Sequence, residues 1–154
     1  TLFDAPLVYI TGHENFRLRK EEEAALREYL LNGGFLFAEA CCGRKGFDLA
    51  FKTAMRQMLP EHNLVKVQQG SALLSLPNKV DRVNVTPALA AHLGNSAPPP
   101  MLEAIEIDGH FAVIYSPYGL AGGWEMSQNP YAHGLEDSGA MQLGQNILMY
   151  AVTQ

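Results

Sequence analysis

FLFAEACCGRKGFDLAFKTAMRQMLP, residues 35–60, carries an apolar run, a glycine-containing turn and an amphipathic segment in that order. Residues 35–40 are short, apolar and rich in aromatic side chains, as is typical of a buried strand. In residues 47–59 the apolar side chains recur at helical spacing, and Pro60 ends the pattern. The stretch therefore predicts a strand, a tight turn and a helix that packs back onto the strand.

The same alternation extends to both sides of this stretch. Residues 7–11, LVYIT, predict an earlier buried strand, and residues 20–32 predict a helix whose first turn is acidic and whose end is marked by Gly33 and Gly34. Residues 64–67, LVKV, predict a third strand. Strands that alternate with helices predict right-handed crossovers and a parallel sheet covered on both faces, which is an α/β fold of three layers.

The second half of the chain gives weaker signals. Residues 71–77 and 82–85 are consistent with short strands or with loop, and residues 117–136 predict a loop rich in glycine and aromatic side chains. IEI and FAVIYS flank Asp108–Gly109, a type I′ turn signal that predicts an antiparallel hairpin near the C-terminal end. A last helix begins at Asp137 or Ser138, and its expected buried face comprises Ala140, Leu143, Ile147, Leu148 and Ala151.

Length and charge restrict the class of protein. A chain of 154 residues suits one domain over residues 1–154, and its formal net charge of −5 makes nucleic acid a poor partner. No apolar run is long enough to insert this segment into a membrane. Because the chain opens at Thr1, almost directly into a strand, we expect a fragment of a longer chain. Its localisation stays open among secreted, periplasmic and membrane-tethered, depending on flanking sequence.

Reactive side chains gather after three of the expected strands. His13 and Glu14 follow the first strand, the segment from Glu39 to Gly46 follows the second, and Tyr118 follows the hairpin and leads to Trp124 and His133. Ligands bind beyond the carboxyl ends of parallel strands, so we expect these groups to share one edge of the sheet. The candidate ligand-binding residues there are His13, Glu39, Arg44, Tyr118 and Trp124.

The thiols of Cys41 and Cys42 allow a catalytic interpretation. A cysteine between a strand and a helix has the geometry of a nucleophile elbow, in which the helix N-terminus lowers the thiol pKa. His13 or His133 would be the base, and Glu136 would orient it. However, Glu39 stands where the elbow pattern requires a glycine. The alternative is that both cysteines are small residues packed at a strand end.

A metal is the third interpretation of the same residues. Two thiolates and an imidazole are ligands for Zn²⁺. Successive side chains of a strand point to opposite faces, so we expect Cys41 and Cys42 to diverge, one toward the edge and one inward. The sequence therefore predicts no metal site and no cofactor.

Several segments along the chain resemble the sequence pattern of a known family. The segment LFDAPLVYITGHENFRLRKEEEAALREYLLNGGFLFAEACCGRKGFDLAF resembles the bacterial domain of unknown function 4159, whose pattern includes TGH, EE..LR.YL..GG and CG in this order. IDGHFAVIYSPYGLAGGWE and LGQNILMYAVT fit the same pattern. The resemblance covers nearly the whole chain.

The resemblance implies a flavodoxin-like fold of the class I glutamine-amidotransferase type, similar to trehalose-utilisation domains. It does not imply glutamine hydrolysis. Family members often carry an acid where this chain has a thiol, and a His-Pro where it has Gln69-Gly70-Ser71. Amidotransferases have a late His-Pro-Glu, whereas this chain has His133-Gly134-Leu135-Glu136. Members are often secreted or membrane-tethered.

Two functions follow as hypotheses. The first is a ligand-binding or structural domain without glutaminase activity, whose ligand is a small molecule, a sugar or a peptide. The second is a cysteine-dependent hydrolase or amidotransferase that uses a thiol after the second strand. The oligomeric state is not specified by the sequence.

Overall fold

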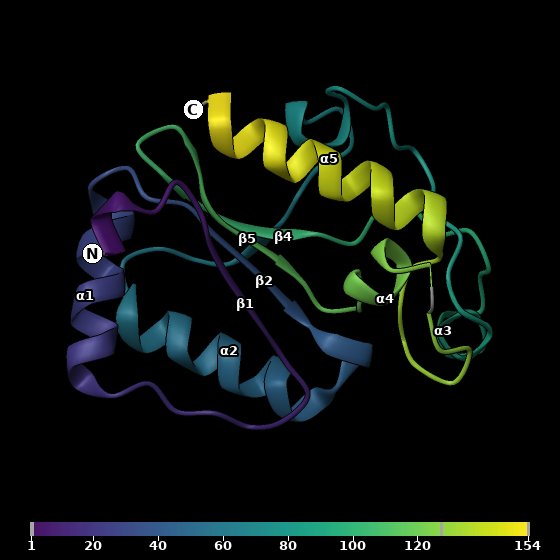
Figure 1. The fold of residues 1–154 in the computed structure, drawn as a ribbon, viewed down its shortest axis with the longest axis horizontal. Helices are drawn as coiled ribbons and strands as arrows, with labels where there is room; N and C mark the ends of the chain where they lie inside the picture. The colour runs from purple at the N-terminus through teal and green to yellow at the C-terminus, as the bar shows by residue number, and fades with distance from the viewer. Residues whose placement is uncertain (1, 127, 154) are drawn as a thin grey trace.

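The computed structural model describes residues 2–126 and 128–153 of the chain, and these form a mixed α/β structure (Figure 1). Its strands are β1 (Val8–Gly12), β2 (Leu36–Ala40), β3 (Val65–Lys66), β4 (Glu103–Ile107) and β5 (His110–Ser116). Its α-helices are α1 (Lys20–Leu31), α2 (Lys45–Met58), α3 (Pro87–Leu93), α4 (Ala121–Trp124) and α5 (Asp137–Thr153). Short 3₁₀ turns span Leu2–Asp4, Cys41–Gly43 and Ala72–Leu74. No helix in the described ranges is both long enough and apolar enough to span a membrane.

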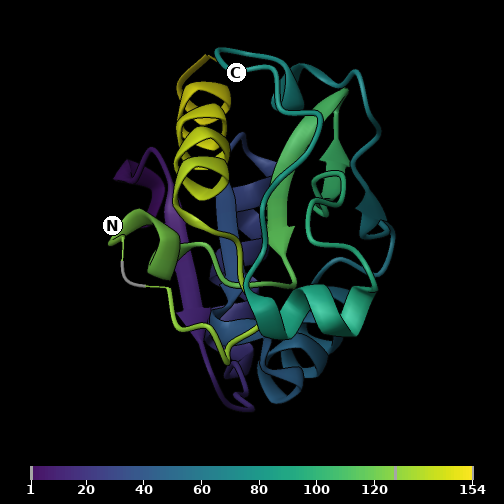
Figure 2. The ribbon, with the colours of Figure 1, turned by 90° about the vertical axis from the view of Figure 1, so that its right-hand side faces the viewer.

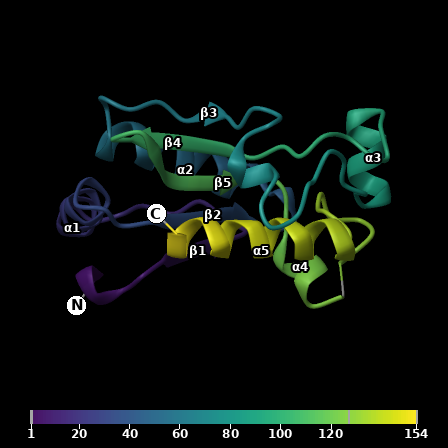
Figure 3. The same cartoon turned by 90° about the horizontal axis from the view of Figure 1, so that it is seen from above.

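The strands form one five-stranded sheet in the order β1-β2-β5-β4-β3, seen from above in Figure 3. β1, β2 and β5 run parallel, while β4 pairs antiparallel with both β5 and β3. The hairpin is confirmed, because Asp108 and Gly109 both have the positive φ, 53° and 85°, that a type I′ turn requires. The hairpin does not lie wholly at an end of the sheet, since its second strand occupies the centre.

Apolar side chains fill both faces of the sheet. On one face α1 and α2 pack on β2 and β5 through a cluster that includes Phe47, Phe51 and Tyr115. On the other face α5 packs through Leu143 and Ile147. Figure 1 shows α2 and α5 on opposite sides of the strands, whereas α3 and α4 lie beyond the end of the sheet where β2 and β5 stop (Figures 1 and 2).

The expected elements need four corrections. β1 is a half-buried edge strand with an exposed Tyr9, because one of its sides has no neighbouring strand. α3 was not expected, although Thr86 caps its N-terminus and Gly94 ends it in the left-handed conformation. α4 interrupts the expected loop over 117–136. Leu148 is 58% exposed, since α5 turns Asn146 and Ile147 toward the core instead.

Phe51 tests the packing of α2. Its side chain is 0% exposed and its ring stacks on that of Tyr115 with centroids 4.3 Å apart. We expect Phe51→Ala to lower the free energy of unfolding by about 3–5 kcal/mol through lost burial and a residual cavity. Chemical denaturation measures this change.

The matched control is Leu49→Ala on the same helix, where the side chain is 65% exposed. It should change the free energy of unfolding by less than about 0.5 kcal/mol. Equal effects of the two substitutions would contradict the assigned helix face.

Candidate functional site

The carboxyl ends of β1, β2 and β5 meet at one edge of the sheet, as expected. Gly12 of β1 lies opposite Ala40 of β2, and Glu39 of β2 lies opposite Ser116 of β5. The turns that follow these strands therefore start side by side, at the end of the sheet that faces the viewer in Figure 2. This edge holds the two cysteines, His13 and, through the loop after β5, Tyr118 and His133.

The expectation that Cys41 and Cys42 diverge is wrong. The two sulfurs lie 3.7 Å apart, and the Cys42 Sγ lies 3.5 Å from Nε2 of His13. Alternation of side chains applies only within a strand, and this pair lies beyond β2 in a 3₁₀ turn. Cys42 adopts the left-handed conformation, φ 61° and ψ 13°, and this turns both thiols toward the same side.

Glu39 lies directly below this turn and is 0% exposed. Its carboxylate accepts hydrogen bonds from the hydroxyl groups of Tyr9 and Thr11, at 3.0 and 3.2 Å. The backbone N–H groups of Leu120 and Ala121 also donate to it, at 2.6 and 3.1 Å. All of these partners belong to the protein itself. Glu39 of β2 is therefore hydrogen-bonded both to β1 and to the loop after β5. Its side chain has no surface exposed to a ligand.

The Cys41 thiol differs from an activated nucleophile. Burial, together with the adjacent Cys42 thiol, raises the pKa of Cys41 to about 12. His133 contacts the cysteine turn through its backbone N–H, which donates to the Cys42 carbonyl at 3.0 Å, while its ring stacks on His92 at 5.0 Å. Burial and the nearby His92 and Lys45 lower the pKa of His133. Of the two candidate bases, His13 is the one beside a thiol.

Glu136, the acid expected to orient the histidine base, is not hydrogen-bonded to a histidine among the described residues. Its side chain is exposed, and its backbone N–H donates to the carbonyl of Asn84 at 2.8 Å. Within residues 2–126 and 128–153 the structure records no hydrogen bond or ion pair between Glu136 and a histidine. The arrangement of thiol, His133 and acid expected from the sequence is therefore not assembled here.

A polar cleft of about 620 Å³ opens on the other side of the cysteine turn. It lies between the start of α2, α3 and the loop after β5. Its polar lining includes Lys45, Asp48, Lys52, Lys66, His92, Glu103, Tyr118 and His133. Pro98, Pro99 and Pro100 supply an apolar part of the wall. Lysines, carboxylates and an aromatic ring around one hollow are typical of a site for a small polar ligand.

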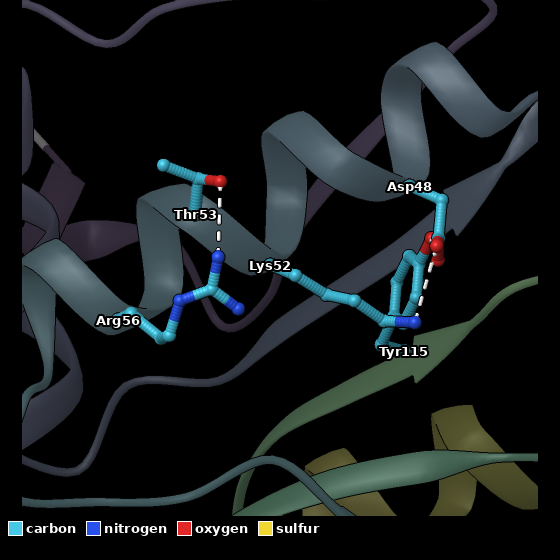
Figure 4. Close-up of polar contacts among 5 residues, drawn as sticks. All are labelled: Asp48, Lys52, Thr53, Arg56 and Tyr115. Atoms are coloured by element: carbon cyan, nitrogen blue, oxygen red, sulfur yellow. Dashed lines mark hydrogen bonds and ion pairs between the residues drawn. The ribbon is translucent and has the colours of Figure 1, made fainter.

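Asp48 lines one side of the cleft. Its carboxylate accepts a hydrogen bond from the Tyr115 hydroxyl at 2.6 Å and pairs with the Lys52 ammonium at 3.1 Å (Figure 4). Burial and the neighbouring Asp48 raise the pKa of Tyr115, so that its hydroxyl stays a donor. Burial also raises the pKa of Glu103. Asp48, Lys52 and His92 were missed as site residues, because nothing in a helical pattern marks which charges face a cleft.

The remaining candidates are dispersed. Arg44 is exposed on the turn into α2. Trp124 lies on the face of the sheet that α5 covers, where its indole N–H donates to the Ala140 carbonyl at 2.6 Å and its ring packs against Phe37. There it lines an apolar hollow of about 350 Å³ between β1 and α5. No ring contact between Tyr118 and Trp124 is recorded among the described residues.

The comparisons with known proteins identify the family. The model of the family described as "Domain of unknown function (DUF4159)" matches residues 1–152, so the chain belongs to this family. A search of curated proteins found no match.

Gly43 tests how tightly the cysteine turn is held. Its φ is +68°, and a Cβ at this position would lie 2.5 Å from the Cβ of His133. We expect Gly43→Ala to lower the free energy of unfolding by about 2–5 kcal/mol, combining a left-handed residue of about 1–2 kcal/mol with overpacking of about 1–3 kcal/mol. Thermal or chemical denaturation measures the loss.

Gly70→Ala is the matched control, because Gly70 has φ +89° and its Cβ would meet no described atom within 4 Å. It should lose only the backbone contribution of about 1–2 kcal/mol. If both variants lose the same amount, the close packing of His133 on the turn is not a constraint.

Proposed function

We propose that this domain binds a small polar ligand in the cleft between α2, α3 and the loop after β5, and that it does not hydrolyse glutamine. The observation that carries the proposal is the cleft itself, in which three lysines, two carboxylates and Tyr118 converge on about 620 Å³. Nothing in the fold alone assigns this role, since one fold supports many functions. The proposal rests on the groups that line the cleft.

The lining favours a ligand with an anionic group on a compact, partly apolar body. Lys45 and Lys66 are exposed, and neither has an ion pair recorded within the described parts of the chain. Their ammonium groups suit a carboxylate or a phosphate. Tyr118 and the proline wall offer apolar surface to a ring or a short side chain. A phosphorylated or carboxylated sugar, or an acidic peptide, combines these features.

The environment of the Cys41 thiol supports the proposed absence of glutaminase activity. Glutamine hydrolysis requires a thiolate nucleophile and a base held beside it. The Cys41 thiol has a pKa near 12, and His133 and Glu136 do not contact either sulfur in the described structure. We further propose that the scaffold is flavodoxin-like and of the class I amidotransferase type, a proposal supported by the parallel β1-β2-β5 unit and the helices on both faces.

Ligand binding is testable with a defined panel of phosphorylated hexoses, hexuronic acids and acidic dipeptides. We expect at least one class to shift the backbone amide resonances around Tyr118, His133 and Lys66 in two-dimensional NMR spectra. Lys66→Met should weaken that binding by about tenfold, because a hydrogen bond to a charged group contributes about 1.5–3 kcal/mol.

Lys20→Met, at the start of α1 and away from the cleft, is the charge-matched control and should leave the affinity unchanged. Shifts confined to residues outside the cleft, or equal losses in both variants, would count against the proposed site.

A second candidate function is thiol-dependent hydrolysis at the same edge of the sheet. One observation favours it: the Cys42 sulfur follows β2 in a left-handed turn and lies 3.5 Å from His13 Nε2. This separation is within hydrogen-bonding reach of a sulfur atom, and a nucleophile and its base make a contact of this kind. No carboxylate is recorded in contact with the His13 ring among the described residues, so the third member of a triad is not assigned.

Alkylation by iodoacetamide distinguishes the two thiols and tests the second candidate. Because burial and the adjacent Cys42 thiol raise the pKa of Cys41 to about 12, this thiol should be alkylated slowly at pH 7. Any alkylation at pH 7 should therefore fall on Cys42, and mass spectrometry of Cys41→Ser and Cys42→Ser identifies the site.

His13→Ala should slow alkylation of Cys42 if His13 acts as its base, whereas His133→Ala should not. The measurement is made with a chelator present, alongside an assay for ammonia released from glutamine. Slow alkylation unaffected by His13→Ala would remove the second candidate, and release of ammonia would overturn the first.

A further inference from the structure

We propose that His13, Cys41 and Cys42 form a zinc site with one coordination position open to solvent. The three side chains come from two segments, the end of β1 and the turn after β2, that lie 28 residues apart between Cys41 and His13. Their ligand atoms all lie within 4.8 Å of one another. This inference goes beyond binding in the cleft, since none of these three residues lines it.

The distances agree with a tetrahedral ion. Zinc lies about 2.3 Å from sulfur and about 2.0–2.1 Å from imidazole nitrogen, so tetrahedral angles place two sulfur ligands about 3.8 Å apart and a sulfur and a nitrogen about 3.6 Å apart. The observed separations are 3.7 Å between the two sulfurs and 3.5 Å between the Cys42 Sγ and His13 Nε2. The third edge, from Cys41 to His13, is no longer than 4.8 Å and is the one left to adjust toward about 3.6 Å.

That edge can shorten because its two ends are held differently. His13 lies on an exposed bend after β1, so its ring can rotate toward the sulfurs. The cysteine turn is held in place by the loop after β5. The Cys42 carbonyl accepts the His133 N–H at 3.0 Å, and the loop after β5 packs so closely that a Cβ at Gly119 would lie 3.0 Å from the Cys42 nitrogen. One mobile and two fixed ligands suffice to close around an ion.

The electrostatics favour a cation between the thiols. Burial and the adjacent Cys42 thiol disfavour a thiolate at Cys41, and the negative charges of Glu39 and Glu125 disfavour it further. A divalent ion reverses this balance. Two thiols give up two protons to solvent, and the ion takes two thiolates and a neutral imidazole, with no change of oxidation state. Binding therefore strengthens as pH rises.

Three protein ligands leave a fourth position, and its direction matters. His13 is exposed and both cysteines are partly exposed, so this position faces solvent. Structural zinc sites are closed by four protein ligands, whereas sites that bind a water or a substrate keep one position open. The geometry places this site in the second class, where the ion would hold a small oxygen or nitrogen ligand.

Cobalt substitution tests the site in the intact domain under reducing conditions. The metal-free protein is titrated with Co²⁺, and Zn²⁺ is then added to displace it. We expect one equivalent to produce tetrahedral d–d bands in the visible and a thiolate-to-cobalt charge-transfer band in the near ultraviolet, both abolished by Zn²⁺. Because the spectrum of the unmodified protein reports thiolate ligation directly, the result does not depend on whether a variant folds.

The variants assign the ligands. Cys41→Ser, Cys42→Ser and His13→Ala should each weaken Zn²⁺ binding by at least about tenfold, the lower end of what loss of even an outer-shell partner costs. His62→Ala, a histidine outside the cluster, is the control and should bind unchanged. An octahedral cobalt spectrum without a charge-transfer band would overturn the proposal. The proposal would also be overturned if His62→Ala lost as much zinc affinity as the ligand variants, or if Cys41→Ser kept the affinity of the unmodified protein. These outcomes are independent of whether the cleft binds its ligand.

Discussion

The buried carboxylate of Glu39 holds together the edge of the sheet on which every candidate site depends. A carboxylate removed from water is costly unless hydrogen bonds replace the solvent. Glu39 receives these bonds from Tyr9 and Thr11 of β1 and from the first N–H groups of α4. Lifting the loop after β5 away would break the two backbone hydrogen bonds that it donates to this carboxylate. This requirement places the loop over the cysteine turn and, through it, places Tyr118 and His133 beside the cleft.

Backbone conformation then decides what the two adjacent thiols can do. In an extended strand neighbouring side chains point apart, and a shared ion or a joint contact with one imidazole would be impossible. The left-handed Cys42 brings the two sulfurs to 3.7 Å instead. A non-glycine residue in this conformation costs free energy, about 1–2 kcal/mol. Contacts around Gly43, His133 and Gly119 maintain it.

The parts of this architecture that sequence predicts are those governed by local pattern. Helical spacing identified Phe51 as a core residue, and Asp108–Gly109 identified the hairpin, because each depends on a few neighbouring residues. Parallel strands also predicted that His13 and the cysteines share an edge. The left-handed state of Cys42 and the partners of Glu39 were not predictable, since both arise from loops packed against them. The exposure of Leu148 was missed because several faces of α5 are apolar.

The cleft and the cysteine cluster occupy opposite sides of one short turn, and this arrangement limits how each can function. His133 lines the cleft, and its backbone N–H donates a hydrogen bond to the Cys42 carbonyl. Gly43 lines the cleft as well and permits the turn through its positive φ. A ligand that displaced His133 would therefore loosen the backbone that aligns the two sulfurs. Conversely, an ion that fixed the sulfurs would hold His133 in its position on the cleft wall, because the same hydrogen bond connects both sides.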